Sequence, residues 1–324
     1  MPTLKDVAKK AKVSVSTASY AMNGSSLILP ETKKRVHDAA KELGYRINGS
    51  AKNLKKSKTE IVAVFISGFT GPVFNEMLEG VHEYIAKHGY ELVVCASNDK
   101  HRLIVENHFD GAIILNYHME NDLLEMIASE KMPIIVLDRE SQHPHIHSLL
   151  LPNDKGVQQI MEAITKSGHE RIGFMAGQGS SFDGEKRLEA FQSFMQERDL
   201  PIYLSDFIRA DFTEESGYHC MAAYLEKTSG KSQATAFVCA NDEMAIGAIR
   251  ASKEKGMRIP EDIAIVGFDD IPIAMYTDPP LTTVRVNKKQ WGKEAARQLL
   301  DRIEKNPTEL PRETMVELVN RGSL

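Results

Sequence analysis

The feature that most constrains the fold is an alternation of two kinds of segment from Ile61 onward. Short apolar runs are typical of buried parallel strands: IVAVFIS, ELVVCAS, GAIIL, PIIVLD, RIGFMAG, TAFVCAND and IAIVGFDD. Amphipathic helical patterns lie between them: FNEMLEGVHEYIAKHG, QQIMEAITKSGH, EKRLEAFQSFMQERD and DEMAIGAIRASKEKG. Strand–helix alternation on this scale predicts doubly wound α/β layers.

Polar pairs follow several of these runs directly. Ligands of doubly wound sheets bind beyond the carboxyl ends of the strands. We therefore expect Asp138-Arg139, Asn241-Asp242 and Asp269-Asp270 to lie along one rim.

The first sixty residues have a different pattern, that of short helices. Thr3 is the expected N-cap of a first helix, with Asp6 as its acidic partner three residues on. A second helix is expected within VSVSTASYAMNG, with Ala18, Ala21 and Met22 on its apolar side. A third begins at Pro30-Glu31 and ends at Gly44. With the tight AKV connection, these helices predict a helix-turn-helix.

The second helix has polar side chains on its other faces. Ser16, Tyr20 and Asn23 recur at helical spacing, and Val15 also points away from the apolar side. A helix-turn-helix exposes its second helix so that N-terminal side chains reach base edges in the major groove. This stretch therefore favours DNA recognition.

Charge is distributed unevenly along the chain. Residues 1–60 carry 13 Lys and Arg against 5 Asp and Glu, whereas the remaining residues carry 27 against 40. A basic segment on an acidic body is typical of a module that binds a polyanion. A lysine-rich solvated surface is the alternative.

The segment RINGSAKNLKKSKT contains four lysines and no acid. Its helix-capable part, Ser50 to Lys56, is too short to be stable alone, so we expect it to order against phosphates. Leu54 has the large apolar side chain suited to a wedge in a minor-groove base step. The alternative is a flexible basic linker.

The strings TLKDVAKKAKVSVSTASYAMNG, ETKKRVHDAAKELGY and SAKNL resemble the DNA-binding headpiece and hinge of the LacI/GalR repressor family. The resemblance implies base reading by Val15, Ser16 and Tyr20, help at phosphates from Ser14, Thr17 and Ser19, and intercalation by Leu54. Tyr20 departs from the arginine of many members, which affects the operator sequence. The full set of expected DNA-binding residues is Ser14, Val15, Ser16, Thr17, Ser19, Tyr20, Asn23, Ser50, Lys52 and Leu54.

The resemblance continues in GHERIGFMAG, KRLEAF, ANDEMAIGAIRA, IPEDIAIVGFDD and PPLTTVR, which look like the type I periplasmic-binding-protein fold. It implies an all-α headpiece with a hinge helix over 1–60 and an α/β effector-binding and dimerisation domain over 61–324. That domain would contain two doubly wound subdomains joined by three crossings. Their expected ranges are about 61–151 plus 284–311, and about 152–283 plus 312–324.

The same resemblance implies an effector site between the subdomains. Asp138 follows a strand as the family's ligand-binding acid does, and Arg187 matches an arginine that grips hydroxyls or a carboxylate. Phe212 matches a ring that packs on the ligand, and Asn241 and Asp269 match polar groups that bind a sugar-like molecule. Such a set suits a polyol in a preformed cleft. The alternative for each polar residue is a helix cap at a strand end.

Some positions depart from the family's pattern. Gly68 stands where many members have Asp, and Pro152 replaces a frequent Asp. The segment KHRLIVENH is shorter than the family's usual full helix at this place. We therefore expect an atypical cleft.

Several other signals are weak. HPHIH aligns three histidines, but Pro144 interrupts it and a solvated loop is favoured over a zinc site. Phe182 stands where a dinucleotide-binding turn needs its last glycine. There is no G-x-S-x-G, Walker A or H-E-x-x-H sequence, so neither catalysis, metal nor cofactor is expected. The start lacks the apolar core of a signal peptide, and no apolar run is long enough to span a membrane, so we expect a cytoplasmic protein.

The leading hypothesis is a transcriptional regulator, in the family's manner a repressor of sugar-utilisation genes, controlled by a sugar-like effector. Its partners would be double-stranded operator DNA, the effector and a second copy of the chain, since a homodimer matches a palindromic operator. Two alternatives stay open: gating by a phosphocarrier protein, and a small-molecule enzyme on the same scaffold.

Overall fold

The computed structural model describes residues 2–46, 58–69, 71, 73–97, 99, 101–228, 232–306 and 316–324. The chain divides into two compact units, Met1–Thr59 and Glu60–Leu324. The hinge residues Ser50, Lys52 and Leu54 lie outside the described residues. Each unit is described by itself.

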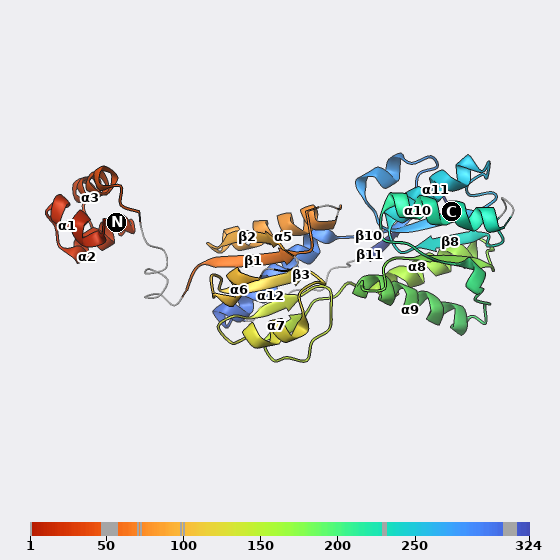
Figure 1. Ribbon diagram of the computed structural model, residues 1–324, viewed down its shortest axis with the longest axis horizontal. Coiled ribbons are helices and arrows are strands. Elements are labelled where there is room, and N and C mark those ends of the chain that lie inside the picture. Colours follow the sequence, from red (N-terminus) through yellow and green to blue (C-terminus); the bar gives the residue numbers. More distant parts are fainter. Residues whose placement is uncertain are drawn as a thin grey trace. The chain divides into compact units, whose positions relative to one another are not determined.

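The described part of the N-terminal unit is entirely helical (Figure 1). Its helices are α1 (Leu4–Ala11), α2 (Val15–Met22) and α3 (Pro30–Leu43). Thr3 and Asp6 form the predicted capping box, and Gly44 ends α3 in the left-handed conformation that glycine accepts readily. Small residues, including fully buried Ala18 and Ala21, fill the core and let the helices approach closely.

The second unit begins with a parallel sheet whose strand order among the described residues is β2-β1-β3-β4-β5. Its strands are β1 (Ile61–Ile66), β2 (Glu91–Ala96), β3 (Gly111–Leu115), β4 (Ile134–Val136) and β5 (Ile146–Ser148). Ile61 lies opposite Glu91 and Ile66 opposite Ala96, which sets the register of β1 against the edge strand β2. The first four strands are the apolar runs that were expected as strands, although β2 is only partly buried. Strand β5 was not predicted: it overlaps the HPHIH segment, where a loop was expected.

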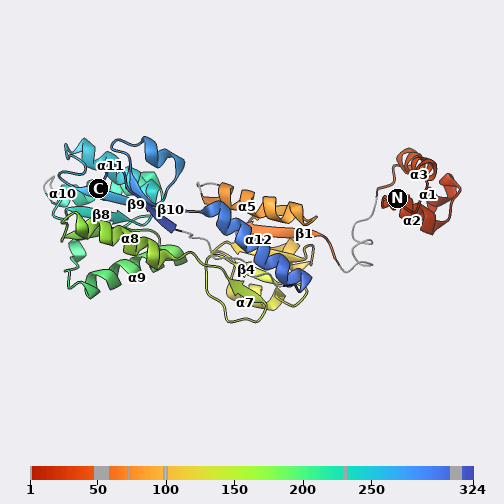
Figure 2. The same cartoon turned by 180° about the vertical axis from the view of Figure 1, so that it is seen from behind.

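Helices cover both faces of this first sheet. Helices α5 (Val73–Lys87) and α12 (Lys288–Glu304) lie on one face, and α6 (Arg102–Val105) and α7 (Asn121–Ile127) on the other (Figure 2). A Cβ atom on Gly80 would lie 2.0 Å from the carbonyl oxygen of Lys289, so the crossing of α5 and α12 requires glycine. The short α6 confirms that KHRLIVENH holds less than a full helix.

The second sheet has the order β11-β10-β9-β8-β6-β7 among the described residues, and only β11 pairs antiparallel. Its strands are β6 (Ile172–Ala176), β7 (Phe207–Arg209), β8 (Ala236–Cys239), β9 (Ala264–Asp269), β10 (Thr282–Val286) and β11 (Val316–Val319). Helices α8 (Asn153–Lys166) and α9 (Phe182–Glu197) pack together on one face. Helices α10 (Glu214–Lys227) and α11 (Asp242–Glu254) pack together on the other (Figure 1). The short 3₁₀ helices are η1 (Leu204–Asp206) and η2 (Pro272–Tyr276).

One crossing between the sheets lies later than expected. We placed the return to the first subdomain near residue 284, but β10 continues to Val286 and pairs with β9. The apolar strand is hydrogen-bonded through Arg285, so the chain leaves the second sheet only after it. The return therefore occurs between Val286 and Lys288, where α12 begins.

Candidate functional site

Helix α2 presents a polar and partly apolar outer face. The side chains of Val15 and Tyr20 are 44% and 53% exposed, and Ser16 is exposed beside them. Ala18 and Ala21, on the inner face, are fully buried. The core therefore accounts for the alanines and leaves the outer side chains free to contact another molecule.

Other residues expected at DNA hold the ends of this helix. The Ser14 hydroxyl caps α2 by accepting a hydrogen bond from the Thr17 amide at 3.0 Å, and it lies 2.8 Å from the Thr17 hydroxyl. At the other end, the Asn23 side chain donates to the carbonyl of Ser19 at 2.8 Å. Ser14, Thr17 and Asn23 thus fix the helix on which Val15, Ser16 and Tyr20 are displayed.

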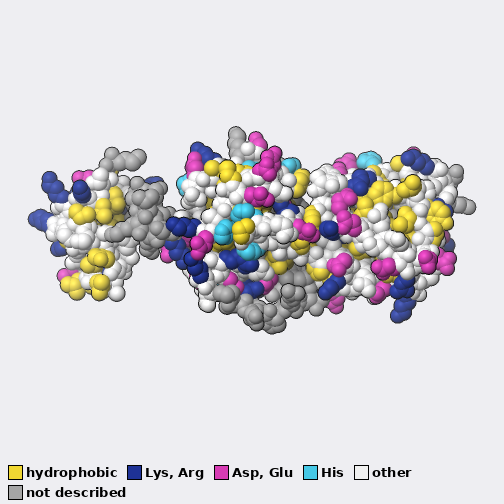
Figure 3. Space-filling model, turned by 90° about the horizontal axis from the view of Figure 1, so that it is seen from below, with side chains coloured by type: hydrophobic (Ala, Val, Ile, Leu, Met, Phe, Trp, Pro, Cys, Tyr) yellow, Lys and Arg dark blue, Asp and Glu magenta, His cyan; other side chains and the backbone are white. Residues whose placement is uncertain are grey.

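The N-terminal unit exposes many basic side chains, most of them on α1 and α3. The exposed Lys and Arg residues described in the unit are Lys5, Lys9, Lys10, Lys12, Lys34, Arg35, Lys41 and Arg46. Lys10 pairs with Glu42. Figure 3 shows dark blue Lys and Arg side chains outnumbering magenta Asp and Glu on this unit's visible surface. The unit has the charge that attracts a polyanion.

The second unit contains a cleft of about 290 Å³ between its two sheets. Ser67, Leu115 and Asp138 line it after strands of the first sheet, and Asn241 and Lys288 line it after strands of the second. The cleft therefore lies beyond the carboxyl ends of both sets of strands, where ligands of such sheets bind.

All five residues predicted for an effector site line this cleft: Asp138, Arg187, Phe212, Asn241 and Asp269. They come from segments that are far apart in the sequence. The topology brings them together because Asp138, Phe212, Asn241 and Asp269 lie at or just after the carboxyl ends of strands, and Arg187 lies in the second turn of α9, the helix that follows β6.

Arg187 connects several elements at the back of the cleft. Its guanidinium donates to the side chain of Asn153 at 2.9 Å and to the carbonyl of Ala240, and its Nη2 lies 3.5 Å from Asp269 Oδ1. The same group stacks over the Phe268 ring at 3.8 Å. Arg187 is 5% exposed, so these contacts hold a buried cation in one orientation.

Two other predicted residues have structural partners as well. The Asp138 carboxylate accepts from Arg139 Nε at 2.9 Å and from its Nη2 at 3.3 Å. Asn241 is the N-cap of α11: it accepts from the Met244 amide at 3.0 Å and donates to the Phe212 carbonyl at 2.8 Å. For Asn241, the helix-cap alternative describes the contacts seen, although its side chain also lines the cleft.

Two residues at the cleft have an unusual backbone. Phe212 and Asp269 have φ angles of +72° and +118°, a region that non-glycine residues rarely adopt. A Cβ atom at Gly177 would lie 2.0 Å from the Phe212 ring, so glycine makes room for that ring. Strained residues of this kind cluster at ligand sites.

Several charged and aromatic side chains that line the cleft were not predicted from the sequence. They are Asp183, Glu243, Lys288, Phe74, Tyr117, Phe182 and Trp291. The strand-end rule that identified Asp269 could also have identified Glu243, which is two residues beyond Asn241. Lys288 is 2% exposed and donates to the carbonyl of Asp269 at 2.6 Å.

Burial raises the pKa values of three acids that line the cleft. Burial raises the pKa of Asp183, and the carboxylates of Asp269 and Asp138 add to this rise against the opposing Arg187. The pKa values of Glu243 and Asp269 are also raised by burial. Behind the cleft, burial together with Asp269 raises the pKa of Asp242 to about 7. Negative charge is therefore costly throughout this region.

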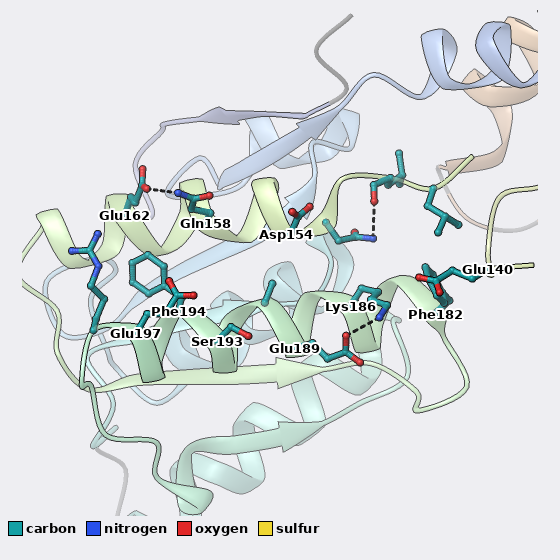
Figure 4. Close-up of a pocket in the computed structure, with 15 residues that line it drawn as sticks. Glu140, Asp154, Gln158, Glu162, Phe182, Lys186, Glu189, Ser193, Phe194 and Glu197 are labelled. Carbon is teal, nitrogen blue, oxygen red and sulfur yellow. Dashed lines mark hydrogen bonds and ion pairs between the residues drawn. The ribbon is translucent and has the colours of Figure 1, made fainter. Parts of the chain in front are cut away.

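A second hollow lies between α8 and α9 and has a volume of about 560 Å³ (Figure 4). It shares Leu151 and Phe182 with the cleft, but none of the five predicted effector residues lines it. Gln158 donates to Glu162 and Lys186 pairs with Glu189 on its walls. These contacts within one helix are typical of solvated helix faces, so the cleft is the better candidate for a ligand site.

The rings of His143 and His145 are 5.8 Å apart, and among the described residues no group of three His, Cys, Asp or Glu could hold a metal ion. Within the same residues, no helix combines the length and apolar character needed to cross a membrane.

Two family models match the chain. Residues 3–48 match "Bacterial regulatory proteins, lacI family", and residues 161–324 match "Periplasmic binding protein-like domain". The HTH-type transcriptional repressor PurR of Pasteurella multocida is 32% identical, with 100% of this chain and 99% of that protein covered. The PurR repressor of Photobacterium profundum is 31% identical with the same coverage.

Solved structures agree with these matches. The complex of the transcriptional regulator CelR with cellobiose has a TM-score of 0.72 and 29% identity, and the alignment covers 100% of both chains. The Lac repressor bound to ONPG in its repressed state has a TM-score of 0.83 and 26% identity, over 100% of this chain and 99% of the other.

Proposed function

Since this chain belongs to the lacI family of bacterial regulatory proteins, we propose that it represses transcription by binding operator DNA through its N-terminal unit. Its relatives are repressors and not enzymes, which agrees with the lack of catalytic motifs in the sequence. The observation that carries the proposal is the exposed outer face of α2 on a basic helical unit.

The residues of α2 divide into two roles. Val15, Ser16 and Tyr20 are exposed and read base edges in the major groove. Ser14 and Thr17 hold the start of the helix, where amide groups and hydroxyls contact phosphates. Ser19 and Asn23 flank the reading face, and Ser50, Lys52 and Leu54 extend the contact into the minor groove.

The protein acts as a homodimer in the cytoplasm. Two headpieces occupy the half-sites of a palindromic operator, because twofold symmetry in the protein matches twofold symmetry in the DNA. Lysines of each unit release counterions from the phosphates, so affinity falls steeply as salt rises.

A small sugar-like effector binds in the cleft and controls this activity. Asp138, Arg187, Asn241 and Asp269 offer acceptors and donors, and Phe212 offers an apolar ring face. The volume of about 290 Å³ is near the lower end for ligand sites, about 300 Å³, which suits a small molecule. The structure of the related regulator CelR with cellobiose supports the sugar-like class. A built cavity favours this effector over control by a phosphocarrier protein.

Effector binding alters operator affinity by changing how the two sheets of the second unit close on the cleft. Arg187 and Lys288 would carry part of this change, since both contact Asp269 while lining the site. A coupling of about 1–3 kcal/mol would alter operator affinity roughly 5–150-fold.

The experiment that tests DNA reading is selection of bound sequences from a random DNA pool by the full chain. We expect enrichment of a palindrome by the wild type, and a relaxed preference at some positions in each half-site for Tyr20→Ala. His37→Ala is the control, since His37 is exposed on α3 of the same unit. Failure of the wild type to enrich any sequence would contradict the proposed function.

A further inference from the structure

The charges lining the cleft are unbalanced. Its acids are Asp138, Asp183, Glu243 and Asp269, whereas its cations are Arg187 and Lys288. Arg139, outside the lining, neutralises Asp138 through a two-point contact. An acidic excess therefore remains at the cleft surface.

The cations of the cleft already have acceptors within the protein. Each nitrogen of the Arg187 guanidinium donates to a protein acceptor, at Asn153, Ala240 or Asp269. Lys288 donates to the carbonyl of Asp269 at 2.6 Å. Both cations are therefore buried and held at protein acceptors.

Two acids retain free acceptor capacity toward the cleft. The Glu243 carboxylate accepts no hydrogen bond from any residue that the structure describes, and its charged neighbours are the acids Asp269 and Glu214. Asp183 accepts one hydrogen bond, from Asn153 at 2.7 Å through Oδ1. Burial raises the pKa of both carboxyls; Arg187 and the Asn153 hydrogen bond oppose the rise at Asp183, whereas the charged groups that act on Glu243 are acids.

Aromatic rings complete the lining. Phe74, Tyr117, Phe182, Phe212 and Trp291 border the same cavity as these acids. Trp291 is held by a hydrogen bond from its indole nitrogen to the Leu149 carbonyl at 3.0 Å. Carboxylates together with ring faces form the environment that stabilises an ammonium group, and they disfavour a phosphate or carboxylate.

We propose that the effector is a small polyol carrying a protonated amine, that Glu243 accepts the ammonium group, and that phosphorylated and acidic sugars are rejected. This inference rests on the proposed function, because it specifies the ligand of the same cleft. Asp183 accepts a neighbouring donor of the same molecule. The polyol hydroxyls contact Asp138 and Asp269.

The test is isothermal titration of the full chain with matched sets of probes, at a pH where the amines are protonated. Each set contains a neutral hexose, its 2-amino-2-deoxy form and its 6-phosphate, built on glucose, galactose and mannose. We expect an amino sugar to bind about ten- to a hundredfold more tightly than its neutral parent, and the phosphates not to bind.

Two charge-neutral variants locate the effect. Glu243→Gln keeps the shape of the side chain and should remove most of the preference for the amine while keeping the affinity for the neutral parent. Glu197→Gln makes the same charge change at an exposed position outside the cleft and should leave the preference intact.

Three results would overturn the inference: equal or tighter binding of the neutral or phosphorylated members, persistence of the amine preference in Glu243→Gln, or no binding by any amino sugar. A neutral sugar that binds in the cleft at least as tightly as its amino form and changes operator affinity would overturn the inference while leaving the proposed function in place. Absence of sequence-selective DNA binding would instead refute the proposed function.

Discussion

The outer face of α2 and the cleft of the second unit are built in contrasting ways. The reading residues Val15, Ser16 and Tyr20 lie within one helical stretch, on a unit whose core consists largely of small side chains. The cleft collects its residues from Ser67 to Trp291 across two sheets. A contiguous surface can change its specificity by single substitutions, whereas the cleft depends on contacts between distant elements.

The two regions also differ in electrostatics. The N-terminal unit exposes cations to solvent, where their charge is readily hydrated. The cleft buries acids, and their pKa values rise because burial is only partly compensated. Mutations in the cleft should therefore affect stability strongly, and mutations on α2 should affect recognition with little effect on stability.

The largest change in stability is expected for Arg187→Ala. It removes a buried cation and leaves Asp269 and the Ala240 carbonyl without that partner, so the second unit should lose about 3–5 kcal/mol of unfolding free energy. Urea unfolding followed by the fluorescence of Trp291, the chain's single tryptophan, measures it in this unit.

The control for this prediction is Arg198→Ala, which changes an exposed arginine just after α9. It should cost less than about 1 kcal/mol. Equal losses in the two variants would show that Arg187 is not the buried link described here.

A smaller change in the free energy of unfolding is expected for Asp242→Asn, and its size depends on pH. The folded carboxyl has a pKa of about 7 against an ordinary value of 3.8, so it keeps its proton where the unfolded chain has lost it. Wild-type stability should therefore fall as pH rises through this window. Relative to wild type, Asp242→Asn should gain about 2–4 kcal/mol between about pH 4 and pH 7, measured by the same fluorescence.

Asparagine is a suitable replacement because it keeps an acceptor for the Ile271 amide and can donate to the Thr283 hydroxyl. The difference in stability between Asp242→Asn and the wild type reports the titration of Asp242, because the other acids of the cleft titrate in both proteins. A stability difference between the two proteins that does not vary with pH would contradict the raised pKa of Asp242.

On α2, Tyr20→Ala should reduce affinity for the selected operator by about 1–3 kcal/mol, because a base contact is lost. Affinity for a scrambled duplex should hardly change, since phosphate contacts dominate it. Fluorescence anisotropy with both duplexes measures the two values. A parallel loss on both would mean that Tyr20 contributes to general affinity and not to sequence reading.

The smallest effect is expected for Ser14→Ala, which removes the N-cap of α2 and should cost about 1 kcal/mol of stability in the N-terminal unit. Thermal unfolding of the helices by circular dichroism measures it, and the Trp291 transition should be unchanged. Ser26→Ala, at an exposed position after α2, is the control. A shift of the Trp291 transition would show that the units unfold together.

Local signals were enough to predict the helical unit. Thr3, Pro30 and Gly44 mark helix ends through capping and backbone preferences that act within a few residues. Apolar runs likewise predicted most of the strands, because most of these runs are buried. The short strands β5 and β7 were missed because three residues that include a polar or charged side chain form no apolar run. The crossing after Val286 was misplaced because the apolar pattern does not show on which sheet a strand pairs.

The cleft was only partly predictable. Asp269 and Asn241 were found because they lie at the carboxyl ends of strands, Asp269 as the last residue of β9 and Asn241 two residues after β8. Asp183 and Glu243 lie in the first turns of helices, where acids are common for purely local reasons. Lys288 was missed because lysine is rarely buried, and only the tertiary structure places the Asp269 carbonyl beside it.

The central claim is that the cleft of the second unit controls DNA binding by the first. The most direct measurement is the operator dissociation constant of the full chain, with and without a saturating sugar or amino sugar that raises its melting temperature. We expect a change of roughly 5–150-fold. An unchanged dissociation constant in the presence of a molecule shown to occupy the cleft would contradict it.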